Sequence, residues 1–230
     1  EQLGYELAFS PGGMVYEMSC RLVVDGQLRS ELDLHCRLVN QEAYADRLHF
    51  EELWEASIAL RGLPEKVRGL SPVHALLHAC MHRAHDLSLQ RPDRLKWLYD
   101  IHLLIEGLDP TSWTVFVDSA RTKQLCGVCL RSFDDAAGWF ATTVPESVLS
   151  EMRLSAGTEP IDYRHIGDWR YMQWQNFKAL PDMRARLRWL SERLMLSRSH
   201  MQELHGGNAS LPTLMFRRLL RGVARWRGRE

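Results

Sequence analysis

The segment around Asp25-Gly26 constrains the fold of this chain more than any other. Asp-Gly between two β-forming runs is the strongest short-range hairpin signal, because the turn needs positive φ at both central positions. The flanking runs cover residues 14–24 and 28–39. In the second run the apolar residues Leu32, Leu34, Cys36 and Leu38 alternate with the polar residues Glu31, Asp33, His35 and Arg37. Period two predicts one polar sheet face, with Leu32 and Leu34 entering the core.

A hairpin alone is only marginally stable in water, so these two strands need further strands or helices packed against them. A short strand over 57–60 is the one further candidate, and the β region is therefore expected to be incomplete.

From Ser71 onward the sequence predicts helices. Ser71 is a favoured N-cap residue and Pro72 fits the first helical position. A second helix is expected to follow Asp93 as its cap and to end before Asp109. Further helices are predicted over 111–123, 125–142, near 162, over 182–204 and over 212–226.

These patterns together predict an α+β protein, with an N-terminal β part followed by a mostly helical body and Arg-rich C-terminal helices. The expected division of the chain is 1–70, 71–155 and 156–230.

Charge is unevenly distributed along the chain. The 29 basic and 29 acidic residues sum to zero, but residues 184–230 hold eleven Arg, no Lys and three acidic residues. This local charge of +8 leaves −8 on the first 183 residues. Such a tail predicts contact with an anionic partner, nucleic acid included, or docking on the acidic body. Because Trp189 and Trp226 are the only tryptophans among the arginines and no nucleic-acid motif is present, a solvated or body-docking face is favoured.

The composition also bounds the compartment. Five cysteines are an odd number, which is typical of a reducing cytosol. No apolar run approaches the ~18 residues of a membrane span, and the start of the sequence does not resemble a signal peptide. We therefore expect a cytoplasmic protein without a membrane partner.

Glu31, Asp33 and His35 form the first candidate site. Alternate residues of a strand share one face, so the two carboxylates and the imidazole are expected to lie in a row on a concave polar surface. Enzymes that transfer phosphoryl groups with Mg²⁺ need carboxylate oxygens held rigidly near the metal. The alternative, which the spacing alone favours, is a strand whose polar face is solvated.

A second candidate is the row His74, His78, His82 and His85, which lies on one face of the predicted helix. A pair such as His78 and His82 is spaced to bind a transition metal, and His85-Asp86 is similar to the motif of metal-dependent phosphohydrolases. No Glu follows in a His-Glu-x-x-His arrangement, so a polar packing face is favoured and no bound metal is expected there.

Cys126 and Cys129 form a lone Cys-x-x-Cys. Zinc would need a second pair of ligands and redox chemistry would need a βαβ context, so helix cysteines without chemistry are the favoured interpretation.

The order of several short segments is more specific than any one of them. Leu-Asp-Leu-His ends the hairpin, and Leu-Trp-Glu follows at 53–55. Three further segments begin at residues 76, 94 and 112: Leu-Leu-His-Ala-Cys-Met-His, Arg-Leu-Lys-Trp-Leu-Tyr-Asp-Ile and Ser-Trp. From about residue 3 to residue 151 the chain resembles nucleotidyltransferase family five, the uncharacterised bacterial nucleotidyltransferases with a DNA-polymerase-β-type fold.

The resemblance implies a partial mixed sheet of the nucleotidyltransferase type and transfer of a nucleotidyl group from a nucleoside triphosphate to a hydroxyl acceptor. In that family two Mg²⁺ ions are held by an early Asp-x-Asp pair and a third Asp. Asp33 matches the third, as catalytic residue and metal ligand, with Glu31 and His35 in support. Nothing here matches the Asp-x-Asp pair or the Gly-rich turn before it. The chain is therefore expected to be a fragment or catalytically incomplete.

Two alternatives stay open. One is a non-catalytic helical interaction module that uses the basic tail, and the other is a His-based metal phosphohydrolase. The catalytic interpretation further predicts that Asp33 lies on a central strand, and that Leu34→Ala costs ~2–5 kcal/mol through loss of core packing.

Overall fold

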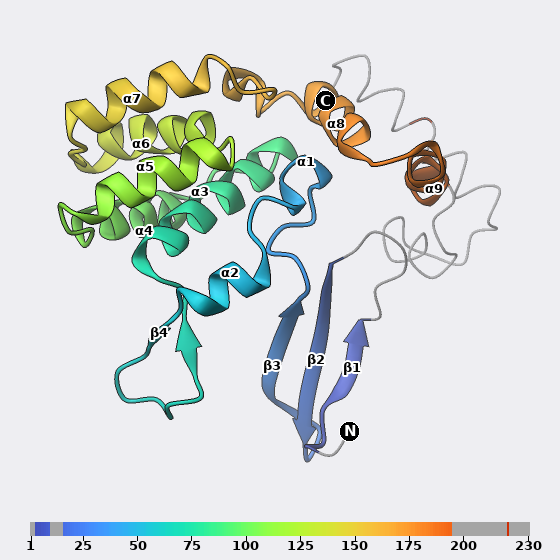
Figure 1. The fold of residues 1–230 in the computed structure, drawn as a ribbon. Helices are drawn as coiled ribbons and strands as arrows, with labels where there is room; N and C mark the ends of the chain where they lie inside the picture. Colours follow the sequence, from blue (N-terminus) through green and yellow to red (C-terminus); the bar gives the residue numbers. More distant parts are fainter. Residues whose placement is uncertain (1–2, 10–15, 195–219, 221–230) are drawn as a thin grey trace. The chain divides into compact units, whose positions relative to one another are not determined.

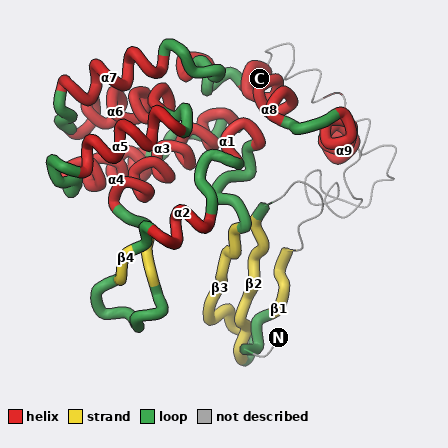
Figure 2. The backbone as a smooth tube through the Cα atoms, in the orientation of Figure 1, coloured by secondary structure: helices red, strands yellow, loops and turns green. Residues whose placement is uncertain are grey.

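The computed structural model describes residues 3–9, 16–194 and 220 of the 230-residue chain (Figure 1). Its architecture is α+β, as predicted: a small antiparallel sheet comes first, and helices make up most of the remainder (Figure 2). The chain forms two compact units, Glu1–Ala179 and Leu180–Glu230. Within the described residues, no helix has the length and apolar character needed to cross a bilayer.

The N-terminal sheet contains β1 (Glu6–Phe9), β2 (Glu17–Val24) and β3 (Gln27–His35), in that order and all antiparallel. The predicted hairpin is confirmed: Asp25 and Gly26 join β2 to β3 with φ of 52° and 72°. Both values lie in the left-handed region that a tight hairpin turn requires.

Three details of this sheet differ from the expectation. The strand β1 was not expected, and it pairs with β2, so β2 is the central strand while β3 is an edge among the described strands. The described pairings are antiparallel throughout, and the mixed sheet implied by the resemblance is not found among them. Leu32 and Leu34 do not enter a core but are 44% and 52% exposed. Alternation fixed which residues share a face, but whether anything covers that face depends on tertiary packing.

Two short helices, α1 (Glu42–Ala45) and α2 (Phe50–Glu55), connect the sheet to the helical body and were not predicted. At four and six residues they are too short for a periodic apolar pattern to reveal them. A small hairpin of β4 (Ile58–Ala59) and β5 (Arg68–Gly69) follows, which confirms the strand expected over 57–60.

The helical body contains α3 (Pro72–Ser88), α4 (Leu95–Glu106), α5 (Ser112–Thr122), α6 (Cys126–Phe140) and α7 (Glu146–Ala156), which pack together in one bundle (Figure 1). Ser71 caps α3 as predicted, because its hydroxyl accepts a hydrogen bond from the backbone N–H of His74 at 3.3 Å. Asp93 does not cap α4. Arg94 is the N-cap residue there, and the carboxylate of Asp93 is bound elsewhere.

The core of this body is built from the apolar faces of its helices. The fully buried side chains include Leu76, Leu77, Ile101, Phe116 and Phe133. Burial of apolar surface on this scale is the main stabilising term, at ~1.5–3 kcal/mol for each large side chain removed from water.

A half-buried carboxylate ties the next segment to α6. Glu159 accepts hydrogen bonds from the backbone N–H groups of Cys126 and Gly127, at 2.7 and 3.0 Å, and so satisfies two donors at the start of that helix. Burial raises the pKa of Glu159, against the lowering effect of these two backbone donors. A side chain at Gly127 would collide with Tyr163, since an added Cβ would lie 2.7 Å from its ring.

The remaining described elements are a 3₁₀ turn (Tyr163–His165), α8 (Trp169–Ala179) and α9 (Met183–Leu194). They confirm the helix expected near 162 and the start of the one expected over 182–204. The rest of the latter lies outside the described residues, as does the helix expected over 212–226 apart from Leu220, which is helical.

Candidate polar site on the N-terminal sheet

The polar face of the sheet carries the three residues singled out by the sequence. Glu31, Asp33 and His35 alternate along β3, and the register places Arg21 opposite Glu31 and Ser19 opposite Asp33. Directly opposite residues of an antiparallel pair lie close enough for their side chains to interact. The sheet therefore determines a different partner for each carboxylate.

Glu31 is neutralised by its neighbour. The Nε of Arg21 donates to Glu31 Oε1 at 2.7 Å, and both side chains are partly solvent-exposed, at 52% and 37%. Such an exposed pair contributes little to stability, but it occupies the carboxylate of Glu31.

Asp33 has a neutral partner instead. The hydroxyl of Ser19 donates to Asp33 Oδ1 at 2.5 Å, and no cationic side chain among the described residues forms an ion pair with Asp33. Of the two carboxylates on this face, Asp33 is thus the one with its charge uncompensated within the described part of the chain.

His35 connects the sheet to the histidine row on α3. Its charge is one of the influences that lower the pKa of His78 to about 4, after burial, which is the largest, and His82. A hydrogen bond between His78 and the backbone of Leu38 opposes the shift. The imidazoles of His35 and His78, which belong to different candidate sites of the sequence, are therefore close enough for their charges to interact.

Segment 16–46 fixes the sheet against α1. The hydroxyl of Tyr16, which precedes β2, donates to the carboxylate of Glu42 at 2.9 Å. Arg37 covers the Tyr16 ring at 4.3 Å and reaches Asp46 at 3.1 Å. Burial, followed by the contact with Glu42, raises the pKa of Tyr16 to about 12, so its hydroxyl stays protonated and remains a donor.

A family model described as "Uncharacterised nucleotidyltransferase" matches residues 1–141 of this chain, which is more than half of its length. The chain belongs to this family. No curated protein and no solved structure matches it.

The family match contains the complete polar face of the sheet and ends after α6, so Asp33, His35 and the histidine row all belong to the nucleotidyltransferase region. The elements α7, α8 and α9 and the Arg-rich segment lie beyond the matched residues.

The histidines of α3 are not gathered around one point: His78 and His82 contact each other, with 6.2 Å between their ring centroids, and His74 has other partners. His74 is buried, and its ring lies 3.1 Å from the Ser71 hydroxyl and 3.2 Å from Glu52 Oε1. His82 packs edge-on against Trp97 at 5.4 Å between ring centroids. In the part of the chain that the structure describes, no three His, Cys, Asp or Glu side chains are placed to share a metal ion.

The cysteines of the Cys-x-x-Cys pair lie in α6 and in the core, where the interpretation as helix cysteines places them. Burial raises the pKa of Cys126 to about 12 and that of Cys129 well above its ordinary value. A thiol that stays protonated is a poor nucleophile and a poor metal ligand.

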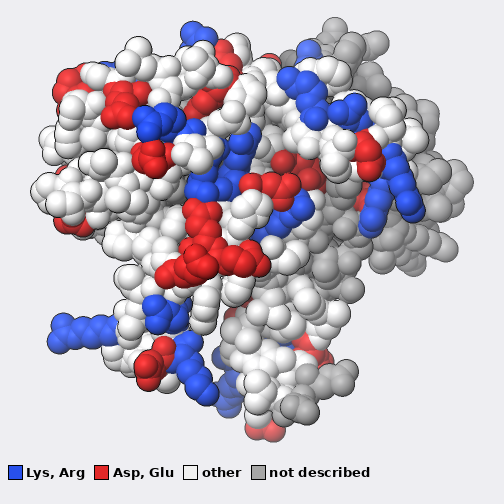
Figure 3. Space-filling model, in the orientation of Figure 1, with Lys and Arg blue, Asp and Glu red and all other residues white. Residues whose placement is uncertain are grey.

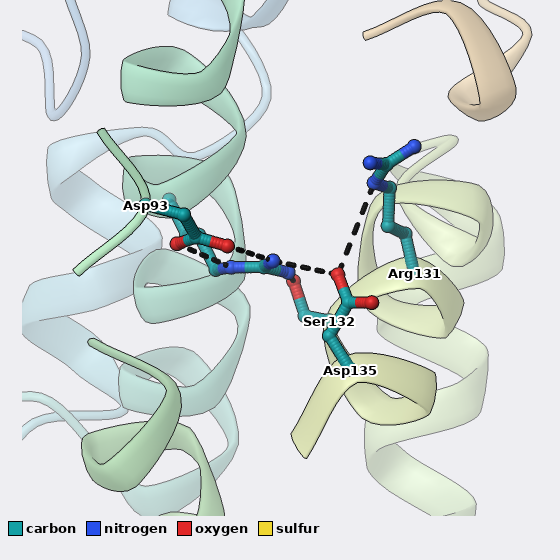
Figure 4. Close-up of polar contacts among 5 residues, drawn as sticks. Asp93, Arg131, Ser132 and Asp135 are labelled. Carbon is teal, nitrogen blue, oxygen red and sulfur yellow. Dashed lines mark hydrogen bonds and ion pairs between the residues drawn. The ribbon is translucent and has the colours of Figure 1, made fainter. Parts of the chain in front are cut away.

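A buried arginine is the polar feature that the sequence did not reveal. Arg83 of α3 is 2% exposed, and its guanidinium binds Asp93 before α4 and Asp135 of α6, with 2.6 Å to the latter (Figure 4). The Ser132 hydroxyl accepts a further hydrogen bond at 3.4 Å. In the sequence Arg83 lies among the histidines and resembles an ordinary surface residue. The two carboxylates that pair with it come from separate segments, so spacing gave no signal.

Proposed function

We propose that this chain serves in the transfer of a nucleotidyl group from a nucleoside triphosphate to a hydroxyl acceptor, and that Asp33 is the carboxylate it contributes to the reaction centre. The family supports the reaction class. The observation that carries the site is the carboxylate of Asp33, which lies on the polar face of the sheet and whose partner among the described residues is a hydroxyl. A carboxylate already paired with Arg, such as Glu31, is less suited to bind a cation.

The described residues do not by themselves fit a magnesium site. Mg²⁺ requires a near-octahedral set of oxygen ligands at ~2.0–2.1 Å. Asp33 offers one carboxylate, Glu31 is held by Arg21, and no group of three acidic, His or Cys side chains converges in the described part of the chain. Further ligands would have to come from outside the described residues.

Two measurements test the activity of the 230-residue chain. It should bind Mg²⁺-nucleotide only weakly, and incubation with labelled nucleoside triphosphates, Mg²⁺ or Mn²⁺ and cell extract should yield no labelled product. Strong labelling that disappears in Asp33→Ala would show that these 230 residues complete the metal site without help.

The site assignment is tested in the natural gene product with two matched variants. Asp33→Asn should lower label transfer by at least about 100-fold, because a carboxylate that binds the catalytic metal stabilises the transition state by several kcal/mol. Asp25→Asn removes an acid from the turn of the same hairpin, where Asn fits equally well, and should leave transfer within about twofold. Equal activity of the two variants would exclude Asp33 from the reaction centre.

A non-catalytic interaction module is the second candidate function. Leu7, Leu32 and Leu34 remain 44–53% exposed on the opposite face of the sheet, and such a surface is typical of a protein contact. This function predicts full biological activity in the Asp33→Asn variant and loss of activity when Leu32 and Leu34 become Gln.

A further inference from the structure

The helix α9 has an exposed apolar stripe. Met183, Leu187 and Leu190 fall within about 60° of arc at 100° per residue, and they are 61%, 62% and 38% exposed. Trp189, about 130° away round the helix, is buried. The helix therefore buries one side through Trp189 and leaves a second, separate apolar stripe at its surface.

Arginines flank this stripe on both sides. Round the helix, Arg184 lies about 100° from Met183 in one direction and Arg186 about 60° from it in the other, so the three apolar residues lie between them. Arg188 lies next to Arg184 and is paired with Glu192 at 2.8 Å. Figure 3 shows Lys and Arg side chains gathered over α9 on the face drawn. The helix is preformed at its start, since Asp182 Oδ1 accepts the backbone N–H of Ala185 at 2.7 Å.

We propose that α9 binds the surface of an anionic lipid bilayer, lying in the interface with Met183, Leu187 and Leu190 toward the acyl chains. A short basic helix with a narrow apolar stripe and low overall hydrophobicity is the type that lies in the headgroup region without crossing the membrane. The charge of residues 184–230, eleven Arg against three acidic residues, complements anionic headgroups. This inference does not depend on the proposed function, and it is an alternative to the expectation that the chain has no membrane partner.

Nucleic acid is the competing anionic partner, and the exposed side chains of α9 argue against it. Single-stranded nucleic acids are bound by aromatic side chains that stack on bases, together with cations that contact phosphates. The aromatic residue of α9, Trp189, is buried, and the exposed apolar residues are Met and Leu. Contact with phosphates stabilises aliphatic side chains little, whereas a hydrocarbon environment removes their apolar surface from water, which is favourable.

The test is flotation of the purified full chain with vesicles of phosphatidylcholine alone and with vesicles containing one-quarter phosphatidylglycerol. We expect binding to the anionic vesicles only, weakened by 0.5 M salt. Arg184→Gln should lower the partition coefficient about fivefold and Leu187→Gln about tenfold.

Two controls are matched to these variants. Leu154→Gln replaces a 79%-exposed leucine of α7, and Arg61→Gln replaces an exposed arginine of the β4–β5 hairpin; both should bind like the unmodified chain. Absence of binding to anionic vesicles, or equal binding of Leu187→Gln and Leu154→Gln, would overturn the proposal. Binding of single-stranded RNA that is lost in Arg184→Gln but unchanged in Leu187→Gln, without vesicle binding, would assign the helix to nucleic acid instead.

Discussion

Replacing Arg83 with Ala removes the cation that joins α3 to the segment before α4 and to α6 (Figure 4). Removing one member of a buried ion pair typically costs ~3–5 kcal/mol, because the remaining charge loses its partner. Here the carboxylates of Asp93 and Asp135 are 32% and 39% exposed, so water can reach both. We therefore expect the lower end, a loss of about 3 kcal/mol in the free energy of unfolding.

Urea titration followed by circular dichroism measures this loss directly, and the thermal midpoint should fall by about 6–12 °C for a unit of this size. Arg131→Ala is the matched control. Arg131 also approaches Asp135, but at 3.9 Å and with 38% of its side chain exposed, so its removal should cost less than about 0.5 kcal/mol.

A double-mutant cycle isolates the contact from the lost volume of the Arg83 side chain. Arg83→Ala combined with Asp93→Asn should be less destabilising than the sum of the single variants by about 1–3 kcal/mol, since the two residues interact directly. A loss below about 1 kcal/mol for Arg83→Ala, or additive behaviour in the cycle, would refute the view that the buried guanidinium holds these segments together.

Two further predictions concern packing and pH. Leu77→Ala should lower the free energy of unfolding by ~2–5 kcal/mol because Leu77 is fully buried. Leu34→Ala should lower it by less than about 1 kcal/mol because Leu34 is 52% exposed. Urea unfolding of both variants measures these losses, and equal losses would contradict the burial pattern. The pKa of His78 is lowered to about 4, below its ordinary value of 6.5, so the unfolded chain binds this proton more readily. The contribution of neutral His78 to the free energy of unfolding is complete above pH ~6.5 and is lost as the pH falls toward 4. Unfolding at pH 7.5 and pH 5 should show a smaller difference in His78→Leu than in the unmodified chain, and an unchanged difference would disprove the assignment.

The polar face of the sheet illustrates how far spacing alone can predict. Alternation placed Glu31, Asp33 and His35 on one face, and the structure confirms it. The same alternation could not distinguish the two carboxylates, because their difference comes from the cross-strand neighbours Arg21 and Ser19. Those neighbours depend on the register of the hairpin, which includes an irregularity between Leu22 and Val23. No local sequence pattern predicts this irregularity.

Local signals were sufficient for the β2–β3 hairpin and for α3 to α6, but α7 was not predicted. The Asp25-Gly26 turn and the Ser71 cap each follow from backbone and side-chain chemistry within a few residues, so the sequence by itself determined them. The short helices α1 and α2 were missed because they contain too few residues to establish a period.

Tertiary structure alone decided which faces are covered and which charges meet. Leu32 and Leu34 alternate with polar residues, as core residues of a strand do, and yet they remain exposed. Arg83 is of a residue type that usually lies at the surface, and yet it is buried and bound to two carboxylates. Burial and ion pairing depend on what segments distant in sequence bring to the same place. The free energy of a side chain is set there by its neighbours in space, and a linear pattern does not specify those neighbours.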